Sequence, residues 1–421
     1  MRLVPGPASV SAASAPGVRI VLDARPLQEP DRAPTTAAYL GGLLEAFDAH
    51  PRPGESFAFL LQSDLDDPTV RLERLAVVGR RLLPPTRLLR SGALTVDPFL
   101  LRGASLGAAW RAERGGAAGA VYHAAGGAVP LLSGIPTVVT LLDLAPWELP
   151  QAYQRGVATR FGQRLRAQLL RDAGAVIVGS VAVAHAARRL LHLRPERVHV
   201  VALAPRPEFR LVVDPDAVRR ERERLGLPER YLVYSGRFDA RQDVATLLRA
   251  LADLAARPRP AALPAAVPWP PRLLLAGASP EDRAALARAA AREGVGEALA
   301  YAPSLAADRL ATLVGGARAA VMPVVSDAAG LSAIEAIAAG TPVVASAVGA
   351  LPTVVGSAGI LVEPRDPGRL AVALSTVWSD DRVHAGVADA AAERARGDRR
   401  VWADVADETR AVYAAVGVAP R

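Results

Sequence analysis

Short apolar runs alternate along the chain with longer segments in which apolar residues recur every three or four positions. The runs are rich in Val, Ile and Leu, which is typical of parallel strands that are buried on both faces. The segments between them have helical spacing, so the alternation predicts an α/β architecture built on parallel sheets. The runs lie at 18–26, 136–143, 174–180, 197–203, 230–237, 272–279, 297–303, 319–325, 341–346 and 358–364.

A charged helical stretch, "DPDAVRRERERLGL", separates the first four runs from the last six, and the pattern then starts again. This restart predicts two parallel-sheet domains in series, for which 421 residues are sufficient. The last stretch has helical spacing, and its return to the N-terminal domain is one option. The predicted divisions are a flexible tail at 1–17, an N-terminal domain at 18–207, a C-terminal domain at 208–395 with a Pro-rich insertion at 256–272, and a final helix within 396–421.

One carboxylate interrupts an otherwise apolar helix face. The helix predicted from Gly330 to Gly340 places Glu335 on the same face as Leu331 and Ala338, which is the face that should be buried. A buried carboxylate without a partner is costly, so Glu335 requires one. Two kinds of partner remain open: an arginine or loop of the protein itself, or a ligand that offers hydroxyl groups.

The start of this helix has the chemistry of an anion site. A helix N-terminus attracts phosphate through its N–H groups and its dipole, and Gly330 lets the backbone at Leu331 approach a ligand closely. Arg237 and Arg241, in "SGRFDARQD", can hold a diphosphate through paired N–H groups. We therefore predict a nucleotide site, with the diphosphate at the helix end and ribose hydroxyls on Glu335.

Polar residues also follow several apolar runs of the N-terminal half. Asp23, Asp143 and Ser180 come where three of these runs end. Ligands of open α/β sheets bind beyond the carboxyl ends of the strands, which makes these residues candidates for the facing side of a cleft. Polar loops follow strands in any protein, so the ordinary explanation stays open for each of them.

Composition excludes several classes of function. The chain carries a net charge of +8, but all its basic residues are arginine, which indicates GC-rich codon use more than a nucleic-acid surface. Cysteine is absent, and neither a Walker loop nor a G-x-G-x-x-G motif after a strand is present. No apolar run is long enough to span a bilayer, and the start lacks a signal-peptide core, which predicts a cytoplasmic protein.

The segments around these candidates resemble the retaining glycosyltransferases of family 4, which have the two-domain GT-B fold. The similar segments occur in the order of that family: "RIVLDARPLQ", "VYHAAGGAVPLL", "PTVVTLLDLAP", "AVIVGSVAVAHAARRLL", "YSGRFDARQDVATLLRALADL", "LLLAGASPEDRAALARAAAREG" and "SDAAGLSAIEAIAAGTPVVASAVGALPTVVGSAGILVEPRDPGRLAVAL".

The resemblance implies a nucleotide-sugar donor held mainly by the C-terminal domain, an acceptor held by the N-terminal domain, and no metal or other cofactor. The family's two acids, separated by seven residues, fall on Asp327 and Glu335, and its diphosphate arginine falls on Arg237. Asp327 is thereby the candidate catalytic residue. His123, with Asp23, Asp143 and Ser180, is assigned to the acceptor side of the cleft.

The chain departs from the family pattern at several site positions. Gln242 replaces a lysine, Asp327 a glutamate, Ala328 and Ala329 a Gly-Phe pair, and Leu142 a histidine. The Gly-rich loop after the first strand is replaced by "RAPTTAAY". These losses raise the question whether the activity is retained.

Two functions follow from this sequence. The first is a bacterial hexosyltransferase of polysaccharide biosynthesis, acting on a glycan or lipid-linked acceptor with retention and without metal. The alternative is a degenerate GT-B protein that binds a nucleotide, a glycan or a partner enzyme without turnover. The amphipathic stretch 157–171 is either an ordinary surface helix or a site of peripheral membrane contact.

Overall fold

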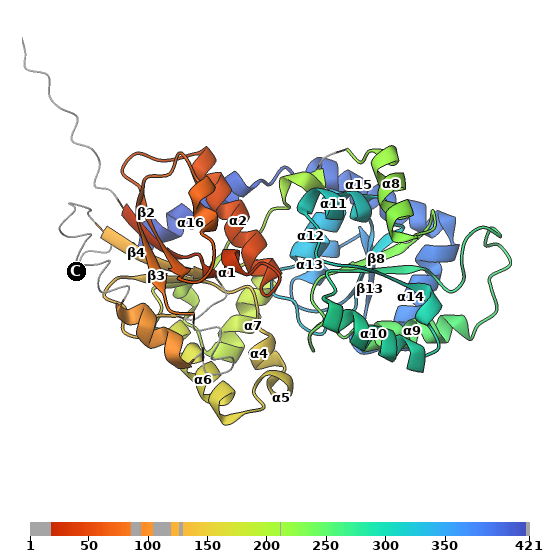
Figure 1. Cartoon of the computed structure of the whole chain (residues 1–421), viewed down its shortest axis with the longest axis horizontal. Helices are drawn as coiled ribbons and strands as arrows, with labels where there is room; N and C mark the ends of the chain where they lie inside the picture. Colours follow the sequence, from red (N-terminus) through yellow and green to blue (C-terminus); the bar gives the residue numbers. More distant parts are fainter. Residues whose placement is uncertain are drawn as a thin grey trace, which may run out of the picture.

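Two parallel β-sheets with helices packed against them make up the protein in the computed structural model (Figure 1). The structure describes residues 18–85, 93, 95–103, 119–125, 129–210 and 212–417. The predicted tail at 1–17 lies outside the described residues. The pairs between neighbouring strands of both sheets are parallel, which confirms the predicted fold class of two Rossmann-like, doubly wound domains.

The N-terminal sheet has seven strands in the order β3-β2-β1-β4-β5-β6-β7. The chain adds β2 and β3 on one side of β1 and then returns to add the others on the opposite side. Its strands are β1 (Val18–Asp23), β2 (Ser56–Gln62), β3 (Val77–Leu83), β4 (Gly119–Ala125), β5 (Thr137–Thr140), β6 (Ala175–Val178) and β7 (Val198–Val200). The helices described in this half are α1 (Arg25–Gln28), α2 (Pro34–Ala49), α4 (Ala145–Glu148), α5 (Pro150–Tyr153), α6 (Val157–Asp172) and α7 (Val181–Leu191), with 3-10 turns at Pro68–Arg71 and Pro195–Arg197.

The C-terminal sheet has six strands in the order β10-β9-β8-β11-β12-β13. The direction of winding reverses between β8 and β11, and ligands of such sheets bind at this switch point. Its strands are β8 (Leu232–Ser235), β9 (Leu273–Ala276), β10 (Leu299–Ala302), β11 (Ala319–Met322), β12 (Val343–Ser346) and β13 (Gly359–Val362). The helices are α8 (Pro215–Leu225), α9 (Val244–Ala255), α10 (Pro280–Arg292), α11 (Ala307–Gly315), α12 (Leu331–Ala338), α13 (Leu351–Val355), α14 (Pro367–Ser379) and α15 (Asp381–Gly397), with 3-10 turns at Pro207–Arg210 and Gly296–Ala298.

Each of the ten apolar runs contains a strand, whereas β2, β3 and β4 fall outside them. β3 is an edge strand, and its middle residues, which include Arg80 and Arg81, are exposed or half-buried. It therefore lacks the continuous apolar character of a buried strand. β4 is buried but consists largely of small residues together with His123. The apolar runs thus include the edge strands β7, β10 and β13 but miss two interior strands, β4 and the apolar, buried β2.

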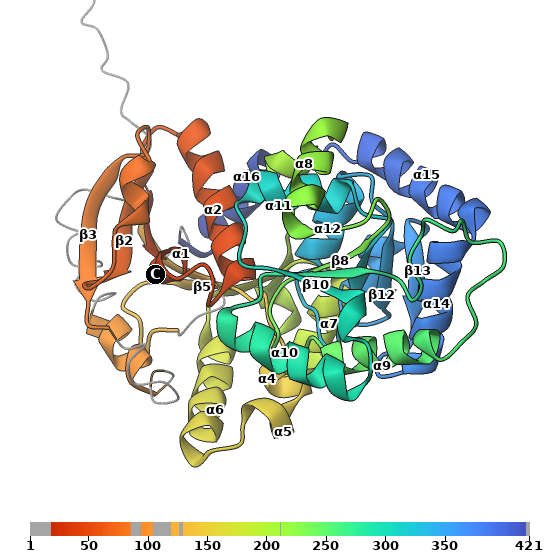
Figure 2. The same cartoon turned by 45° about the vertical axis from the view of Figure 1, so that its right-hand side comes forward.

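The last helix, α16 (Trp402–Gly417), lies against the N-terminal domain rather than the domain that precedes it. Figures 1 and 2 both show it beside α2. Its residues Trp402, Val405 and Tyr413 share one buried cluster with Tyr39 and Phe47 of the N-terminal domain. The chain thus passes between the domains twice, once near residue 205 and once near residue 400.

The two crossings are hydrogen-bonded to each other. Arg210 donates to the carbonyl oxygens of Asp398 and Arg400, at 2.7 and 2.6 Å. Arg400 in turn donates from Nε to the carbonyl oxygen of Ala202 at 2.7 Å. These bonds hold the two passages of the chain side by side.

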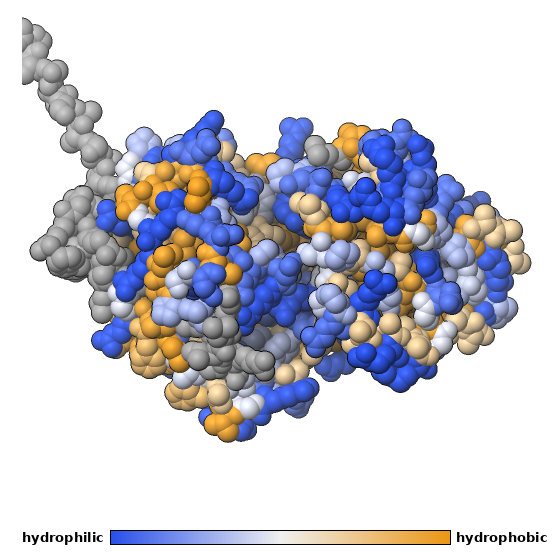
Figure 3. All heavy atoms as spheres, viewed as in Figure 1, coloured by the Kyte–Doolittle hydropathy of each residue, from blue (hydrophilic) through white to orange (hydrophobic). Residues whose placement is uncertain are grey.

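The surface shown in Figure 3 mixes hydrophilic and hydrophobic residues, and hydrophilic residues gather where the two domains meet. Within the described part of the chain, no helix combines the length and the hydropathy needed to cross a bilayer.

Two adjacent glycines of α2 allow a test of how α16 is docked. A Cβ added at Gly42 would lie 2.3 Å from the Trp402 indole, whereas one at Gly41 would approach nothing closer than 3.9 Å. We expect Gly42→Ala to lower the free energy of unfolding by about 1–3 kcal/mol through overpacking. Gly41→Ala should raise it by about 0.5–1 kcal/mol through helix propensity. Urea unfolding of both variants checks this, and equal effects would contradict the packing of α16 on α2.

Candidate functional site

A cavity of about 1020 Å³ lies between the two domains at the carboxyl ends of the C-terminal strands. It spans the switch point between β8 and β11, and the start of α2 closes it from the N-terminal side. Its polar and charged lining residues include Asp31, Arg206, Ser235, Arg237, Asp239, Arg241, Gln242, Ser304, Ser326, Asp327 and Glu335. Four of the predicted site residues, Arg237, Arg241, Leu331 and Glu335, and the candidate catalytic Asp327, are therefore brought together here.

Arg241 lies between carboxylates of both domains. Its Nη1 is 2.9 Å from Asp143 Oδ2 of the N-terminal domain, and its Nε is 3.4 Å from Asp239 Oδ1 of its own loop. Arg237 also reaches the N-terminal domain, since its Nη1 donates to the Arg32 carbonyl oxygen at 2.5 Å. Both arginines that were expected to hold a diphosphate thus bridge the two domains.

Two buried donors at the switch point lack a hydrogen-bond partner among the described residues. One is the hydroxyl of Ser326, a residue that is 3% exposed, and the other is the Nε–H of Arg241. An unsatisfied buried donor costs about 1–3 kcal/mol, so such groups are uncommon in folded proteins. Both residues line the cavity, which is the position where a phosphate or sugar oxygen could accept from them.

Asp327 is hydrogen-bonded to the loop just before the helix end that was expected to bind phosphate. Its Oδ1 accepts from the backbone N–H groups of Ala329 and Gly330, at 2.9 and 2.6 Å. The short aspartate side chain thus folds back onto the backbone of its own loop and takes the Gly330 N–H, whereas the N–H groups of α12 itself, from Leu331 on, receive no side-chain cap. Burial raises the pKa of the Asp327 carboxyl, and these two hydrogen bonds partly oppose that shift.

The loop before α12 packs against the N-terminal domain. Ala328 belongs to a buried cluster with Val178 and Val183, whereas Ala329 and Leu331 belong to the cluster that contains the β1 core. α12 itself begins at Leu331, after Gly330 in a left-handed conformation with φ of 65°. The domains are thus in contact next to the candidate catalytic residue.

Glu335 has a partner within the protein. Arg206 donates to it from Nε at 2.6 Å and from Nη2 at 3.0 Å, so the pair is bidentate. The side chain of Glu335 is buried, as its place on the helix face predicted, and burial raises its pKa while Arg206 lowers it. Of the two partners left open by the sequence, the structure contains the arginine, so a ribose is not needed to explain the buried acid.

The four residues assigned to the acceptor side do not line the cavity. Asp23 forms an ion pair with Arg25 at 2.8 Å, and the Ser180 hydroxyl caps α7 by accepting from the Val183 N–H. Asp143 contacts Arg241 from beside the cavity. The bonds of Asp23 and Ser180 thus stay within the N-terminal domain, whereas Asp143 contacts an arginine of the cavity.

His123 lies in the core of the N-terminal domain. It is fully buried between the hydroxyls of Thr140, 2.9 Å from Nε2, and Tyr413, 2.6 Å from Nδ1. Burial lowers its pKa to about 3, so the imidazole is neutral near neutral pH. Its contact is with α16, and not with the cleft.

Sequence reasoning missed Asp31, Arg206, Ser304 and Ser326. Ser326 directly follows the last residues of the run at 319–325, so the same strand-end rule could have found it. Arg206 lies in the passage between the domains, where no periodic pattern marks it. In the part of the chain that the structure describes, no three His, Asp or Glu side chains are grouped so that they could hold a metal ion.

Residues 229–380 match the sequence model of the family described as glycosyl transferases group 1. Among solved structures, sucrose-phosphate synthase from Thermosynechococcus elongatus superposes with a TM-score of 0.69 at 21% identity, covering 94% of this chain and 98% of that one. Anabaena Alr3699/HepE in complex with UDP and glucose superposes with a TM-score of 0.67 at 17% identity, covering 94% and 99%. The chain has the GT-B fold.

Related sequences agree with this fold. The D-inositol 3-phosphate glycosyltransferase of Streptomyces avermitilis is 33% identical over 269 residues, covering 59% of this chain and 56% of the relative. That of Streptomyces scabiei is 32% identical over 296 residues, covering 68% and 63%. These matches extend over only about three fifths of the relatives' length.

The Arg206–Glu335 pair predicts a specific stability effect. Arg206→Met leaves the buried carboxylate without its partner, so we expect the free energy of unfolding to fall by about 3 kcal/mol. Adding Glu335→Gln should recover much of the loss, because the uncompensated charge is gone. Arg220→Met removes an exposed ion pair with Asp214 and should change stability by less than about 0.5 kcal/mol. A double variant no more stable than Arg206→Met would contradict the pairing.

Asp327 predicts a pH effect on stability. The pKa of the Asp327 carboxyl is raised in the folded state. The contribution of this carboxyl to the free energy of unfolding is therefore fully present below its ordinary pKa of 3.8 and is lost as the pH rises through the raised pKa. Asparagine keeps an oxygen for both N–H groups but does not titrate. Asp327→Asn should therefore gain stability relative to the wild type as the pH rises from 4. Urea unfolding at several pH values checks this, with Asp366→Asn at the exposed cap of α14 as control. Parallel wild-type and Asp327→Asn curves would refute it.

Proposed function

We propose that the protein is a retaining glycosyltransferase of family 4, which moves a hexose from a nucleotide-sugar to a glycan or lipid-linked acceptor without a bound metal. The observation that carries the proposal is the pair of unsatisfied donors, Ser326 Oγ–H and Arg241 Nε–H, at the switch point of a GT-B cleft. Phosphate oxygens are strong acceptors, and a diphosphate at this point would satisfy both.

Different residues of the cavity would contact different parts of the nucleotide-sugar donor. The guanidinium groups of Arg237 and Arg241 would stabilise the charge that develops on the leaving diphosphate, which is the electrostatic role a metal has in other transferases. Glu335 uses one lone pair of each carboxylate oxygen for Arg206, so further acceptor sites remain for ribose hydroxyls. Asp327 lies where the donor sugar would meet the acceptor.

In the proposed reaction, the bond between the anomeric carbon and the diphosphate oxygen breaks, and the acceptor oxygen bonds to the same face of the sugar. The acceptor proton passes to the leaving diphosphate. Asp327 is held by the Ala329 and Gly330 N–H groups, so its role would be to orient the sugar rather than to take this proton.

The acceptor side and cellular site are also proposals. A cytoplasmic protein with a lipid-linked acceptor would work at a membrane surface. On α6, Val157 and Phe161 are 75% and 55% exposed, whereas Leu169 is buried, so only the start of the predicted apolar face is free. Arg160 and Arg164 on the same helix have the charge that an anionic membrane would attract.

A second candidate is a binding protein without turnover. The observation that favours it is that the carboxylate of Asp327 lies beside the start of α12 and takes the Gly330 N–H, so a negative group already stands where the diphosphate would bind. Gln242, which replaces the expected lysine, is neutral and accepts from the Tyr234 hydroxyl at 3.1 Å. Fewer positive groups are then available to the diphosphate than in the family pattern.

Calorimetry with nucleoside diphosphates, followed by assays of diphosphate release from UDP-, GDP- and ADP-hexoses, separates the candidates. We expect binding, and turnover that EDTA does not reduce. Ser326→Ala should weaken binding about tenfold, the value of one hydrogen bond to a charged group. Ser379→Ala, which removes another unsatisfied buried hydroxyl away from the cavity, should leave binding unchanged. Binding without turnover on any acceptor would support the second candidate, and no nucleotide binding would refute both nucleotide-based proposals.

A further inference from the structure

One end of the cavity has the shape and chemistry of a base-binding slot. If the diphosphate lies at the switch point, as the proposed function requires, the nucleoside extends toward the ends of β9 and β10, where the cavity continues. The lining there includes Ala276–Pro280, Asp282, Pro303–Leu305 and Leu310, and Asp282 is paired with the Ser279 hydroxyl. Pro30 and Asp31, on the loop that leads into α2, face it from the N-terminal domain.

The floor of this end is backbone. Gly236 and Gly277 both have positive φ, at 150° and 95°, and a Cβ on Gly277 would lie 2.8 Å from the Gly236 carbonyl oxygen. Side chains are therefore excluded where β8 and β9 end. Leu305 and Leu310 supply aliphatic surface at the side. A backbone surface without side chains, with leucine side chains beside it, fits the planar ring of a nucleotide base.

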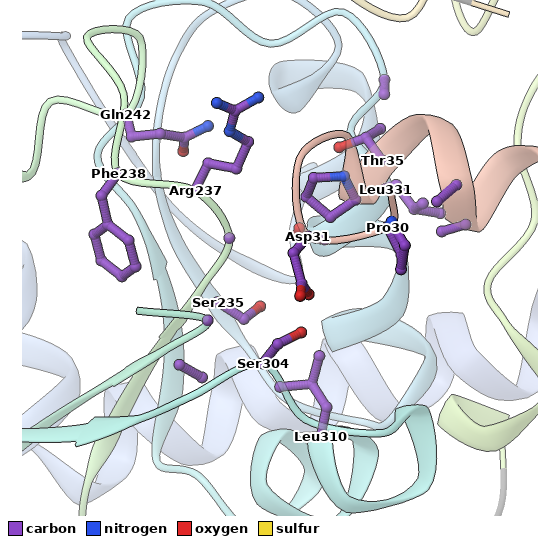
Figure 4. Close-up of a pocket in the computed structure, with 18 of the residues that line it drawn as sticks. Pro30, Asp31, Thr35, Ser235, Arg237, Phe238, Gln242, Ser304, Leu310 and Leu331 are labelled. Carbon is purple, nitrogen blue, oxygen red and sulfur yellow. The ribbon is translucent and has the colours of Figure 1, made fainter. Parts of the chain in front are cut away.

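Asp31 is an exposed acid of this end that is not paired within the described structure. It forms no hydrogen bond or ion pair with any other described residue, in contrast to the paired acids Asp239, Asp327 and Glu335 of the same cavity. Figure 4 shows its carboxylate pointing into the cavity, toward the side lined by Ser235 and Ser304. The Ser235 and Ser304 hydroxyls likewise form no hydrogen bond to a described side chain.

A carboxylate in this place discriminates between bases. Guanine presents two adjacent donors, N1–H and the 2-amino group, which a carboxylate accepts in a bidentate manner, and its O6 can accept from a serine hydroxyl. Uracil presents one N–H between two carbonyl oxygens, which a carboxylate repels. Adenine places a ring acceptor beside its amino group. The unpaired acid therefore favours one base and disfavours the other two.

We infer that Asp31, with Ser304, selects a guanine nucleotide, so that the donor of the proposed transferase is a GDP-sugar. Alr3699/HepE, which has the same fold, was solved with UDP. The choice of base is then determined by the residues at this end of the cavity and not by the fold. Figure 4 shows the Asp31 carboxylate on the side of Ser304, which follows β10, and this is the end where the nucleoside would lie.

Calorimetric titration of the full chain with GDP, UDP and ADP tests the inference. The wild type should bind GDP about 10- to 100-fold more tightly than UDP or ADP, the discrimination of one bidentate base contact. Asp31→Asn, which turns one acceptor into a donor, should lose most of this preference while its unfolding midpoint stays unchanged. Asp253→Asn, an exposed change on α9 outside the cavity, should keep the preference.

The outcomes distinguish this inference from the proposed function. UDP or ADP binding as tightly as GDP overturns the guanine assignment and leaves the transferase standing. Asp31→Asn weakening all three nucleotides equally also overturns it, because the carboxylate then contacts ribose or sugar. Binding of none of the three overturns the transferase and the inference together.

Discussion

The candidate site depends on one guanidinium that two domains share. Arg241 contacts Asp143 from the N-terminal domain and Asp239 from the C-terminal domain, and it still has an Nε–H without a hydrogen-bond partner in the described structure. The two carboxylates orient the group, and its Nε, 3.4 Å from Asp239 Oδ1, still lacks a hydrogen bond of good geometry. This shared contact joins the two domains next to the contact of Arg237 with Arg32 and the packing of the loop before α12.

Internal pairing also decides which cavity charges are available to a ligand. Glu335 is neutralised by Arg206, and Asp327 is used by the backbone of its own loop. Asp31 is unpaired within the described chain, so its carboxylate is the acid of the cavity whose charge is left for a ligand. A nucleotide entering the cavity would meet unsatisfied donors at the switch point and an unsatisfied acceptor at the far end.

The fold could be predicted from the sequence because burial on both faces leaves a strong mark on parallel strands. All six strands of the C-terminal sheet, β8 to β13, and the burial of Glu335 follow from apolar runs and helical spacing. The partner of Glu335 could not be predicted, because Arg206 lies 129 residues away in a passage without periodicity. The role of Asp327 could not be predicted either, because one methylene decides whether an acid reaches a ligand or its own backbone.

The N-terminal candidates show the limit of reasoning from strand ends. Asp23, His123 and Ser180 are polar and follow or belong to buried strands, but each is satisfied by a neighbour in its own domain. A sequence contains the type of a side chain but not the direction in which its hydrogen bonds are made. Position in the chain therefore identifies the edge of the sheet, and only contacts identify which residues face the cavity.

The double passage of the chain between the domains has a mechanical consequence. Two crossings that are hydrogen-bonded to each other act as one hinge. The relative motion of the domains that costs the least energy is then rotation about the line through both crossings. Sliding or twisting of one sheet past the other would break the bonds between the crossings. Arg206 lies on one of these crossings, next to the hinge axis. Opening of the cleft would therefore move Arg237 and Arg241 away from their N-terminal contacts while the Arg206–Glu335 pair, close to the axis, stays nearly fixed.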